Sequence, residues 1–280
     1  PLSYFSSLFL RNKFIIIEYD IYPDALKNIG IRDDSLIFKL WTKINRKVFK
    51  KADCIITLSN GMANLLSKYV NKSKIKVIPN WGSITMNPVP KVDNPFIKEH
   101  HLEGKFVVMY SGNIGYTHHV ETIVALALLL RNEFDIHFMV GGGGKKADLV
   151  KLVEMQGLVN CTFLDWLPAG KIVYSLSAAD LSVVTLTDDT AFVSVPSKTY
   201  NILSVGSPML CVAPEKSEIG QLVKKERCGK CYDKDHVEEM INFILQLKSD
   251  KKYYTEMVKN ALNASTHYTF ANANEYVYHK

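Results

Sequence analysis

The sequence predicts an α/β protein with two lobes, each built on a parallel β-sheet that helices cover. Short apolar runs alternate with helical patterns, and glycine-containing turns close several of these runs. Because each crossover helix covers one face of a sheet, such strands run parallel. The length of 280 residues is sufficient for about two domains. With 47% apolar and 22% charged residues, the composition excludes a disordered chain, a collagen-like fibre and a small disulfide scaffold.

The second lobe contains five strand–turn–helix units between residues 105 and 230. The expected strands are 106–110, 135–140, 161–164, 181–186 and 208–212. The helices that follow them are 120–131, 145–156, 170–179, 197–205 and 217–225. A Rossmann-like sheet of this kind holds ligands beyond the carboxyl ends of its strands. The loops of interest are therefore 111–119, 141–145, 165–169, 187–197 and 213–218.

The first lobe is expected to be incomplete. Its strands are 14–18, 53–58 and 75–78, with helices at 36–50 and 61–68. Three strands fall short of the five or six of a complete lobe, so we expect the missing strands to precede Pro1. The proline-containing stretch that follows has little periodicity and is interpreted as a linker. The predicted domains are 1–83, a linker at 84–104, and 105–264.

Two loop segments of the second lobe have the chemistry of an anion site. The turn 111–115 lies between a strand and a helix, where glycines let backbone N–H groups face a ligand. Pro196 and Ser197 resemble a helix start, and Lys198 adds a point charge suited to phosphate. Each segment alone is also compatible with an ordinary turn or cap, but two at one sheet end favour a diphosphate. The candidate residues are Ser111, Gly112, Asn113, Gly115, Ser197 and Lys198.

The cysteines do not form a metal-binding pattern. The five are Cys54, Cys161, Cys211, Cys228 and Cys231. Their odd number and scattered positions are typical of a reduced cytosolic protein. The lone Cys-Gly-Lys-Cys lacks the second ligand pair that structural zinc requires, so we interpret it as the edge of a strand. We expect no metal site.

The basic charge is concentrated in one predicted helix. The chain carries 34 basic and 28 acidic residues, a net charge of +6, and the segment 35–51 contains six bases and no acid. The bases are Lys39, Lys43, Arg46, Lys47, Lys50 and Lys51. A separate apolar stripe consists of Leu36, Ile37, Leu40, Trp41, Ile44 and Val48. The segment is either a surface helix of the first lobe or a helix that lies against anionic lipid headgroups.

Taken together, these segments resemble the family 4 glycosyltransferases, which are retaining, nucleotide-sugar-dependent enzymes of the GT-B fold. The similarity is greatest to the bacterial members that build O-antigen, capsule and exopolysaccharide. Four stretches carry it, and they span most of residues 14–268. They are Asp20-Ile-Tyr-Pro-Asp24, Ile78-Pro-Asn-Trp81, Tyr110-Ser-Gly-Asn-Ile-Gly115 and 195–208, which begins Val-Pro-Ser-Lys-Thr-Tyr.

The resemblance implies that the second lobe binds a UDP- or GDP-linked sugar without a required metal. The diphosphate would lie on the 111–115 turn and near Lys198. The base, ribose and sugar would contact Leu164, Asp165, Trp166, Tyr200 and Asn201. Residues 265–280 would form a helix that returns to the first lobe. That lobe would take a glycan or polyprenyl-diphosphate-linked acceptor at the cytoplasmic membrane face, with Lys39, Trp41, Lys43, Arg46, Lys47 and Lys50 on the membrane side.

The sequence departs from the family pattern at several positions. Val193 and Asn201 occupy the places of two glutamates that many members carry. Asn113 and His118 or His119 stand where many members have Arg and Lys. Acidic residues near Asp20 replace a histidine, which makes Asp20 a candidate catalytic residue. An epimerase of the same fold and a non-catalytic partner subunit remain alternatives, and we expect the 280 residues alone to be an inactive fragment.

Overall fold

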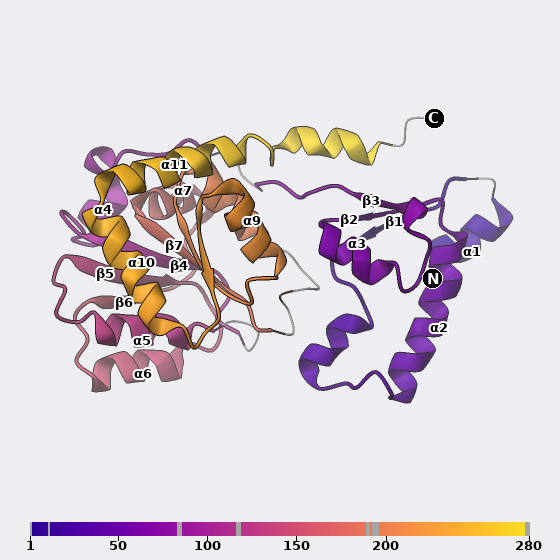
Figure 1. Ribbon diagram of the computed structural model, residues 1–280, viewed down its shortest axis with the longest axis horizontal. Helices are drawn as coiled ribbons and strands as arrows, with labels where there is room; N and C mark the ends of the chain where they lie inside the picture. The colour runs from indigo at the N-terminus through magenta and orange to yellow at the C-terminus, as the bar shows by residue number, and fades with distance from the viewer. Residues whose placement is uncertain are drawn as a thin grey trace. The chain divides into compact units, whose positions relative to one another are not determined.

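The computed structural model describes residues 2–10, 12–82, 86–115, 119–188, 191 and 196–277, which form two compact units (Figure 1). The first unit contains the described residues of 1–80, 188–195 and 270–280. The second contains those of 81–187 and 196–269. Both units are α/β structures with parallel sheets, so the predicted fold class is confirmed.

The first unit has a three-stranded parallel sheet with the order β1-β2-β3. Its strands are β1 (Ile15–Glu18), β2 (Cys54–Thr57) and β3 (Ile75–Val77). Its helices are α1 (Leu2–Phe9), η1 (Asp24–Ile29), α2 (Leu36–Lys51), α3 (Asn60–Leu66), η2 (Lys72–Lys74) and η4 (Phe270–Tyr276). Ile55 of β2 pairs with Ile16 on one side and Ile75 on the other. The buried core includes Phe14, Ile21, Phe49, Ile55, Met62 and Leu66.

The chain's last described segment, η4, packs on this first unit. Lys76 Nζ donates to the carbonyl of Glu275 at 3.0 Å, and Asn272 Nδ2 donates to the carbonyl of Pro79 at 3.4 Å. Residues 265–269 belong instead to the second unit. The segment that joins the first unit is therefore a short 3₁₀ helix rather than a helix from residue 265 onward.

The second unit has a six-stranded parallel sheet with the order β6-β5-β4-β7-β8-β9. The strands are β4 (Phe106–Ser111), β5 (Ile136–Gly141), β6 (Cys161–Leu164), β7 (Leu181–Thr185), β8 (Met209–Val212) and β9 (Gly229–Tyr232). The helices are α4 (Pro95–Glu99), α5 (Glu121–Leu129), α6 (Ala147–Met155), α7 (Ala169–Ala178), α8 (Lys198–Ser204), α9 (Glu218–Glu226), α10 (Val237–Ser249) and α11 (Lys251–Ser265), with η3 at Lys91–Asp93. The order reverses between β4 and β7, as in a doubly wound sheet.

Alternate residues of β4 divide the core of this unit between the two faces of the sheet. Val108 and Tyr110 face a cluster that includes residues of α5 and α10. Val107 and Met109 face the cluster around α4 and α7. Burial on both faces explains why the strand is a continuous apolar run. Figure 1 shows the helices on either side of this sheet.

Side-chain caps fix the beginnings of several helices where the sequence has Ser, Asn or Asp. Ser35 accepts from the N–H of Phe38 at the start of α2, and Ser217 accepts from that of Gly220 at the start of α9. Asp250 does the same for α11. Each cap satisfies one of the backbone donors that a helix leaves unpaired in its first turn.

One part of the chain differs from its sequence-based interpretation, and another confirms it while adding a strand. The predicted linker 84–104 contains α4, whose Phe96 and Ile97 are buried in the core of the second unit. A helix of five residues is too short to show a helical period, so the pattern could not reveal it. The interpretation of the Cys-Gly-Lys-Cys segment as the edge of a strand is confirmed: Cys228 immediately precedes β9 and Cys231 lies within it. β9 is the edge strand of the sheet and adds a sixth strand to the five expected.

Candidate functional site

The reversal of strand order places two loop segments at one end of the second unit's sheet. β4 ends at Ser111 and leads into the 111–115 turn, while β7 leads toward the segment before α8. Ligands of doubly wound sheets bind in the crevice where the carboxyl ends of such strands diverge. This is the end of the sheet at which the sequence predicts a diphosphate.

The backbone of the 111–115 turn pairs with the next glycine loop. The N–H of Gly112 donates to the carbonyl of Gly141 at 3.0 Å, and that of Ile114 donates to Gly143 at 2.8 Å. A Cβ atom on Gly142 would overlap the Gly112 carbonyl, so this close approach requires glycine. Among the described residues, the N–H groups of Asn113 and Gly115 have no acceptor. Only some of the backbone N–H groups of the turn are therefore available to bind an anion.

Lys198 lies directly beside this turn. Its Nζ is buried, is 3.9 Å from the centroid of the Tyr110 ring, and has no hydrogen-bond partner in the described part of the chain. A Cβ atom on Gly112 would lie 3.1 Å from the same Nζ. Burial lowers the pKa of Lys198 from 10.5 to about 7 because the ammonium form loses solvation. The structure thus brings together Lys198 and Gly112, two residues that the sequence singles out.

Tyr110 is a residue of this site that sequence reasoning missed. Its hydroxyl donates to the carbonyl of Asn113 at 2.6 Å, which holds the turn, and its ring lies against the Lys198 amine. Burial raises the pKa of this phenol. An aromatic residue at the end of the strand was visible in the sequence, but its contact with a lysine 88 positions later depends on tertiary structure.

The start of α8 is not capped by the side chain of Ser197, although the sequence suggests a capped helix start there. Ser197 has a helical conformation, and its side chain makes no capping hydrogen bond. Thr199 Oγ1 is buried without a hydrogen-bond partner among the described residues. Tyr200 is buried, with its ring 5.1 Å from that of Tyr268, and Asn201 is half-buried one position further. The Tyr200 ring is therefore packed inside the unit rather than open toward the turn.

The predicted base-binding loop lies beside the glycine loop. The carbonyl of Leu164 accepts from the N–H of Gly142 and from Lys146, which also pairs with Asp165. A Cβ atom on Gly143 would overlap the indole of Trp166, which is 63% exposed. The backbone of Leu164 is thus occupied, whereas the backbone groups of Asp165 and Trp166 have no partner among the described residues.

Two of the family departures can be placed only in part. Val193 and His118 lie outside the described residues. His119 is described, and its Nδ1 is 3.1 Å from Glu121 Oε1. Within the described ranges, no group of three His, Cys, Asp or Glu side chains could hold a metal ion.

In the first unit, a carboxylate pair lies at the end of strand β1. Glu18 is the last residue of β1, and the exposed Asp20 lies two positions later. Burial, with a smaller contribution from the charge of Asp20, raises the pKa of Glu18 to about 7. The sequence points to Asp20 but not to Glu18, since only the structure shows that this carboxyl group is desolvated.

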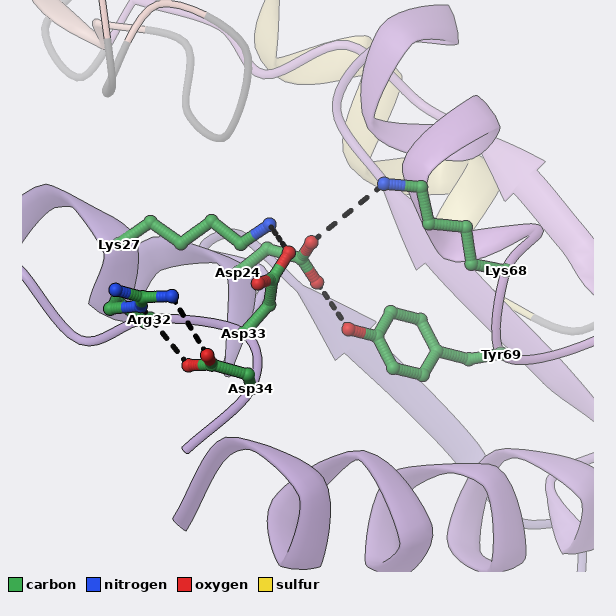
Figure 2. Close-up of polar contacts among 7 residues, drawn as sticks. All are labelled: Asp24, Lys27, Arg32, Asp33, Asp34, Lys68 and Tyr69. Carbon is green, nitrogen blue, oxygen red and sulfur yellow. Dashed lines mark hydrogen bonds and ion pairs between the residues drawn. The ribbon is translucent and has the colours of Figure 1, made fainter. Parts of the chain in front are cut away.

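The second carboxylate of the Asp20–Asp24 motif is buried and held by two partners (Figure 2). The Tyr69 hydroxyl donates to Asp24, and Lys68 Nζ lies 3.9 Å from it. Asp24 is therefore a structural anchor between the loop and the end of α3. Figure 2 also shows two exposed ion pairs of the same loop, Lys27–Asp33 and Arg32–Asp34.

The basic helix α2 is exposed along two of its sides. All six predicted bases are exposed: Lys39, Lys43, Arg46, Lys47, Lys50 and Lys51. A simple surface helix would bury its apolar stripe, but most of the stripe of α2 is exposed. The side chains that α2 buries are Phe38 and Phe49. No described helix is both long and apolar enough to cross a membrane.

Comparison with known proteins adds information about the chain as a whole. Residues 93–264 match the family described as Glycosyl transferases group 1. The chain is 27% identical over 220 residues to a probable glycosyltransferase WbjE of Pseudomonas aeruginosa, covering 78% of this chain and 55% of that protein. It is 28% identical over 244 residues to a putative colanic acid biosynthesis glycosyl transferase, WcaI, of Escherichia coli K12, covering 84% and 60%.

A solved structure extends the likeness to the fold. Anabaena Alr3699/HepE in complex with UDP superposes with a TM-score of 0.80 at 16% identity, covering 98% of this chain and 73% of that one. At this identity the likeness shows the fold alone, and it is the GT-B fold of glycosyltransferases. The chain itself spans 55% and 60% of the length of the two curated relatives.

Proposed function

Because the chain belongs to the glycosyl transferases group 1, we propose that it takes part in transferring a sugar from a nucleotide-sugar to a glycan or polyprenyl-diphosphate-linked acceptor. The proposal includes retention of anomeric configuration, as in the family 4 enzymes that the sequence resembles. The observation that carries it is the buried Lys198 amine, which lacks a hydrogen-bond partner among the described residues and lies beside Gly112 at the switch point of the sheet.

A diphosphate would complete the chemistry of this site. An ammonium group removed from water is unfavourable unless an anion accompanies it, and the open N–H groups of Asn113 and Gly115 are further donors. When the glycosidic bond to the leaving nucleoside diphosphate breaks, negative charge grows on the bridging phosphate oxygen. Fixed donors and a nearby cation stabilise that charge. Lys198 and the turn supply both, so the proposed mechanism requires no metal.

The rest of the donor would extend along neighbouring loops. We place the base against the free backbone of Asp165 and Trp166, and the ribose and sugar near Asn201. The neighbour HepE was solved with UDP, which supports a UDP-linked donor, and GDP is the alternative. The name of WcaI, a putative colanic acid biosynthesis glycosyl transferase, supports a role in the synthesis of a capsule, O-antigen or exopolysaccharide. The proposal places this reaction at the cytoplasmic face of the membrane, as the family resemblance implies.

The test is incubation of the protein with a panel of radiolabelled UDP- and GDP-sugars. Since we expect the 280 residues alone to be inactive, the readout is binding: we expect one donor to be retained by the protein in equilibrium dialysis, and the Lys198→Met variant to retain much less. The exposed Lys151 on α6 provides the control, since Lys151→Met removes a charge of the same kind away from the site. Conversion of a donor to its epimer, or no binding of any donor, would contradict the proposal.

A further inference from the structure

Tyr110 joins the two halves of the proposed anion site. It lies near the end of β4, and its side chain is fully buried. The centroid of its ring is 3.9 Å from Lys198 Nζ, and its hydroxyl donates to the carbonyl of Asn113 at 2.6 Å. One side chain therefore contacts both the lysine at the start of α8 and the turn that follows β4.

The glycine loop 141–145 fixes the carbonyls on either side of Asn113. The carbonyl of Gly112 lies so close to this loop that a Cβ atom on the glycine facing it would overlap it. The carbonyl of Ile114 accepts from a backbone N–H of the loop at 2.7 Å. The N–H of a trans peptide points opposite to its carbonyl. The next N–H groups along the chain, those of Asn113 and Gly115, therefore point away from the glycine loop.

The carbonyl of Asn113 itself points the other way. The N–H of the same peptide group, which belongs to Ile114, donates to Gly143 in the glycine loop at 2.8 Å. This carbonyl is therefore turned away from the loop, as the two open N–H groups are. A bare carbonyl oxygen there would repel a phosphate oxygen, because both carry negative charge. The Tyr110 hydroxyl donates to it and so reduces this repulsion.

The Tyr110 ring favours the charged form of the Lys198 amine. Aromatic faces attract cations within about 6 Å, most strongly where water is excluded. Among the described residues, the titratable groups that face the amine are the Tyr110 phenol and the Cys211 thiol of β8. Burial raises the pKa of both, so both are neutral near pH 7. The ring thus opposes the effect of burial on the pKa of Lys198 without adding a charge.

We propose that Tyr110 is a positioning residue of the anion site: its ring holds the Lys198 amine beside the turn, and its hydroxyl shields the diphosphate from the Asn113 carbonyl. Tyr110 acts through Lys198 and the turn rather than on the ligand itself. The inference rests on the proposed function, because it concerns the same site. It adds that one side chain holds both the cation and the turn, so that removing the ring and removing the hydroxyl have different effects.

The ring is tested by the pKa of Lys198 in the protein without ligand. NMR titration of the full chain with isotope-labelled lysine measures it, and the Lys198→Met variant assigns the signal. Tyr110→Leu removes the ring and should lower the pKa of Lys198 from about 7 to about 6, whereas Tyr110→Phe should keep the parent's value. Tyr110→Met, which fills more of the space, replaces Tyr110→Leu if that variant does not fold. An unchanged or raised pKa in the variants without a ring would overturn the ring's role.

The hydroxyl is tested by calorimetric titration with UDP and GDP at about pH 6, below the pKa of Lys198 in the parent. Tyr110→Phe should weaken binding about two- to tenfold, the range of one hydrogen bond. Tyr110→Leu should weaken it further, because the amine is then no longer held. Equal affinities of the parent and Tyr110→Phe would overturn the hydroxyl's role.

Tyr254 on α11 provides matched controls. Its ring packs edge-on against Phe106, and its hydroxyl lies 3.4 Å from Asp180. Phe106 begins β4 and Asp180 immediately precedes β7, so both lie at the opposite end of the sheet from the turn. Tyr254→Phe and Tyr254→Leu should leave the pKa of Lys198 and the affinity for UDP and GDP unchanged. Equal changes in the Tyr254 and Tyr110 variants would make Tyr110 only a structural residue of the core and would overturn the proposal.

The two measurements separate this inference from the proposed function, since the NMR titration requires no ligand. If Tyr110→Leu lowers the pKa of Lys198 but the parent binds neither UDP nor GDP, the ring's role is supported and the proposed function fails. If the parent binds and all the Tyr110 variants bind equally well, the proposed function is supported and this inference fails.

Discussion

Lys198 is an amine that is buried but has no anion beside it among the described residues. Its pKa of about 7, against an ordinary value of 10.5, is the expected consequence of losing solvent. A bound anion reverses this effect by stabilising the ammonium form. The proposed binding of a diphosphate at this site would therefore be coupled to the uptake of a proton above neutral pH.

The coupling predicts how affinity for a nucleoside diphosphate depends on pH. Between about pH 7 and 10.5 the free protein holds mainly neutral Lys198, so binding must take up a proton. Affinity should then fall as pH rises above 7, by up to about tenfold per unit. Calorimetry at several pH values, in buffers with different ionisation enthalpies, measures both the affinity and the proton uptake. A parent whose affinity is as insensitive to pH as that of Lys198→Met would contradict this assignment.

Gly112 gives a second prediction at the residue scale. Its φ is +155°, and an added Cβ would lie 3.1 Å from Lys198 Nζ and 3.5 Å from its Cδ. Gly112→Ala should displace the amine and weaken nucleoside diphosphate binding about tenfold, or about 1.4 kcal/mol. Gly170→Ala is the matched control, because no atom lies within 4 Å of the added Cβ. Equal affinities of the two variants would show that the turn does not contact the ligand.

The candidate site was predictable where chemistry is local and unpredictable where it depends on packing. Gly112 and Lys198 stand out in the sequence, since a glycine turn after a strand and a lysine at a helix start are local signals. The pairing of Gly112 and Ile114 with the next glycine loop removes two donors, and no local pattern indicates this. The desolvation of Glu18 is likewise a property of the folded unit.

At the scale of elements, Asp24 and Tyr69 join the loop after β1 to the end of α3. Tyr69→Phe removes the hydroxyl that donates to the buried Asp24 and leaves Lys68, at 3.9 Å, as the nearest charge. We expect a loss of about 1–3 kcal/mol in the free energy of unfolding, the usual penalty for a buried group left unsatisfied. Chemical denaturation of the parent and the variant measures it.

The exposed ion pairs of the same loop are expected to stabilise the fold less than the buried Asp24–Tyr69 hydrogen bond does. Arg32 and Asp34 form a pair 2.8 Å long in which both side chains are more than half exposed. Arg32→Ala should change the free energy of unfolding by less than about 1 kcal/mol, because solvent screens surface pairs. If Arg32→Ala lowered the free energy of unfolding as much as Tyr69→Phe does, the contribution of the Asp24 contact could not be attributed to its burial.

The two cysteines at the edge strand β9, one just before it and one within it, are expected to react slowly with alkylating reagents. Burial raises the pKa of Cys228 and of Cys231 to about 12, so little reactive thiolate exists near neutral pH. Both should react with iodoacetamide much more slowly in the native protein than in denaturant, and zinc chelation should not alter the melting temperature. Rapid native labelling of Cys231, or destabilisation by a chelator, would restore a redox or metal role for the pair.

The elements also show where sequence patterns fail. α2 has two apolar sides, and its period cannot decide which of them is buried; Phe38 and Phe49 face the core while the larger stripe faces outward. α4 is too short for any period. The five expected strands of the second unit were found within a residue or two, because each is a run buried on both sheet faces.

At the scale of the whole chain, the two units have separate cores, and all the candidate donor residues lie in the second. We predict that residues 81–269 expressed alone fold and bind nucleoside diphosphate within about threefold of the full chain, since a six-stranded sheet covered on both faces is a complete core. Circular dichroism and calorimetry test this. A folded fragment that does not bind would mean that the first unit supplies part of the nucleotide site.

The central claim is that Lys198 holds the diphosphate of a nucleotide-sugar. Calorimetric titration of the parent, Lys198→Met and Lys151→Met with UDP and GDP at pH 7 tests it most directly. The account predicts that Lys198→Met weakens binding by about 1.5–3 kcal/mol, the range of a charge-assisted hydrogen bond. It also predicts that Lys151→Met binds like the parent. Equal affinities of the parent and Lys198→Met would remove Lys198 from the site and contradict the account.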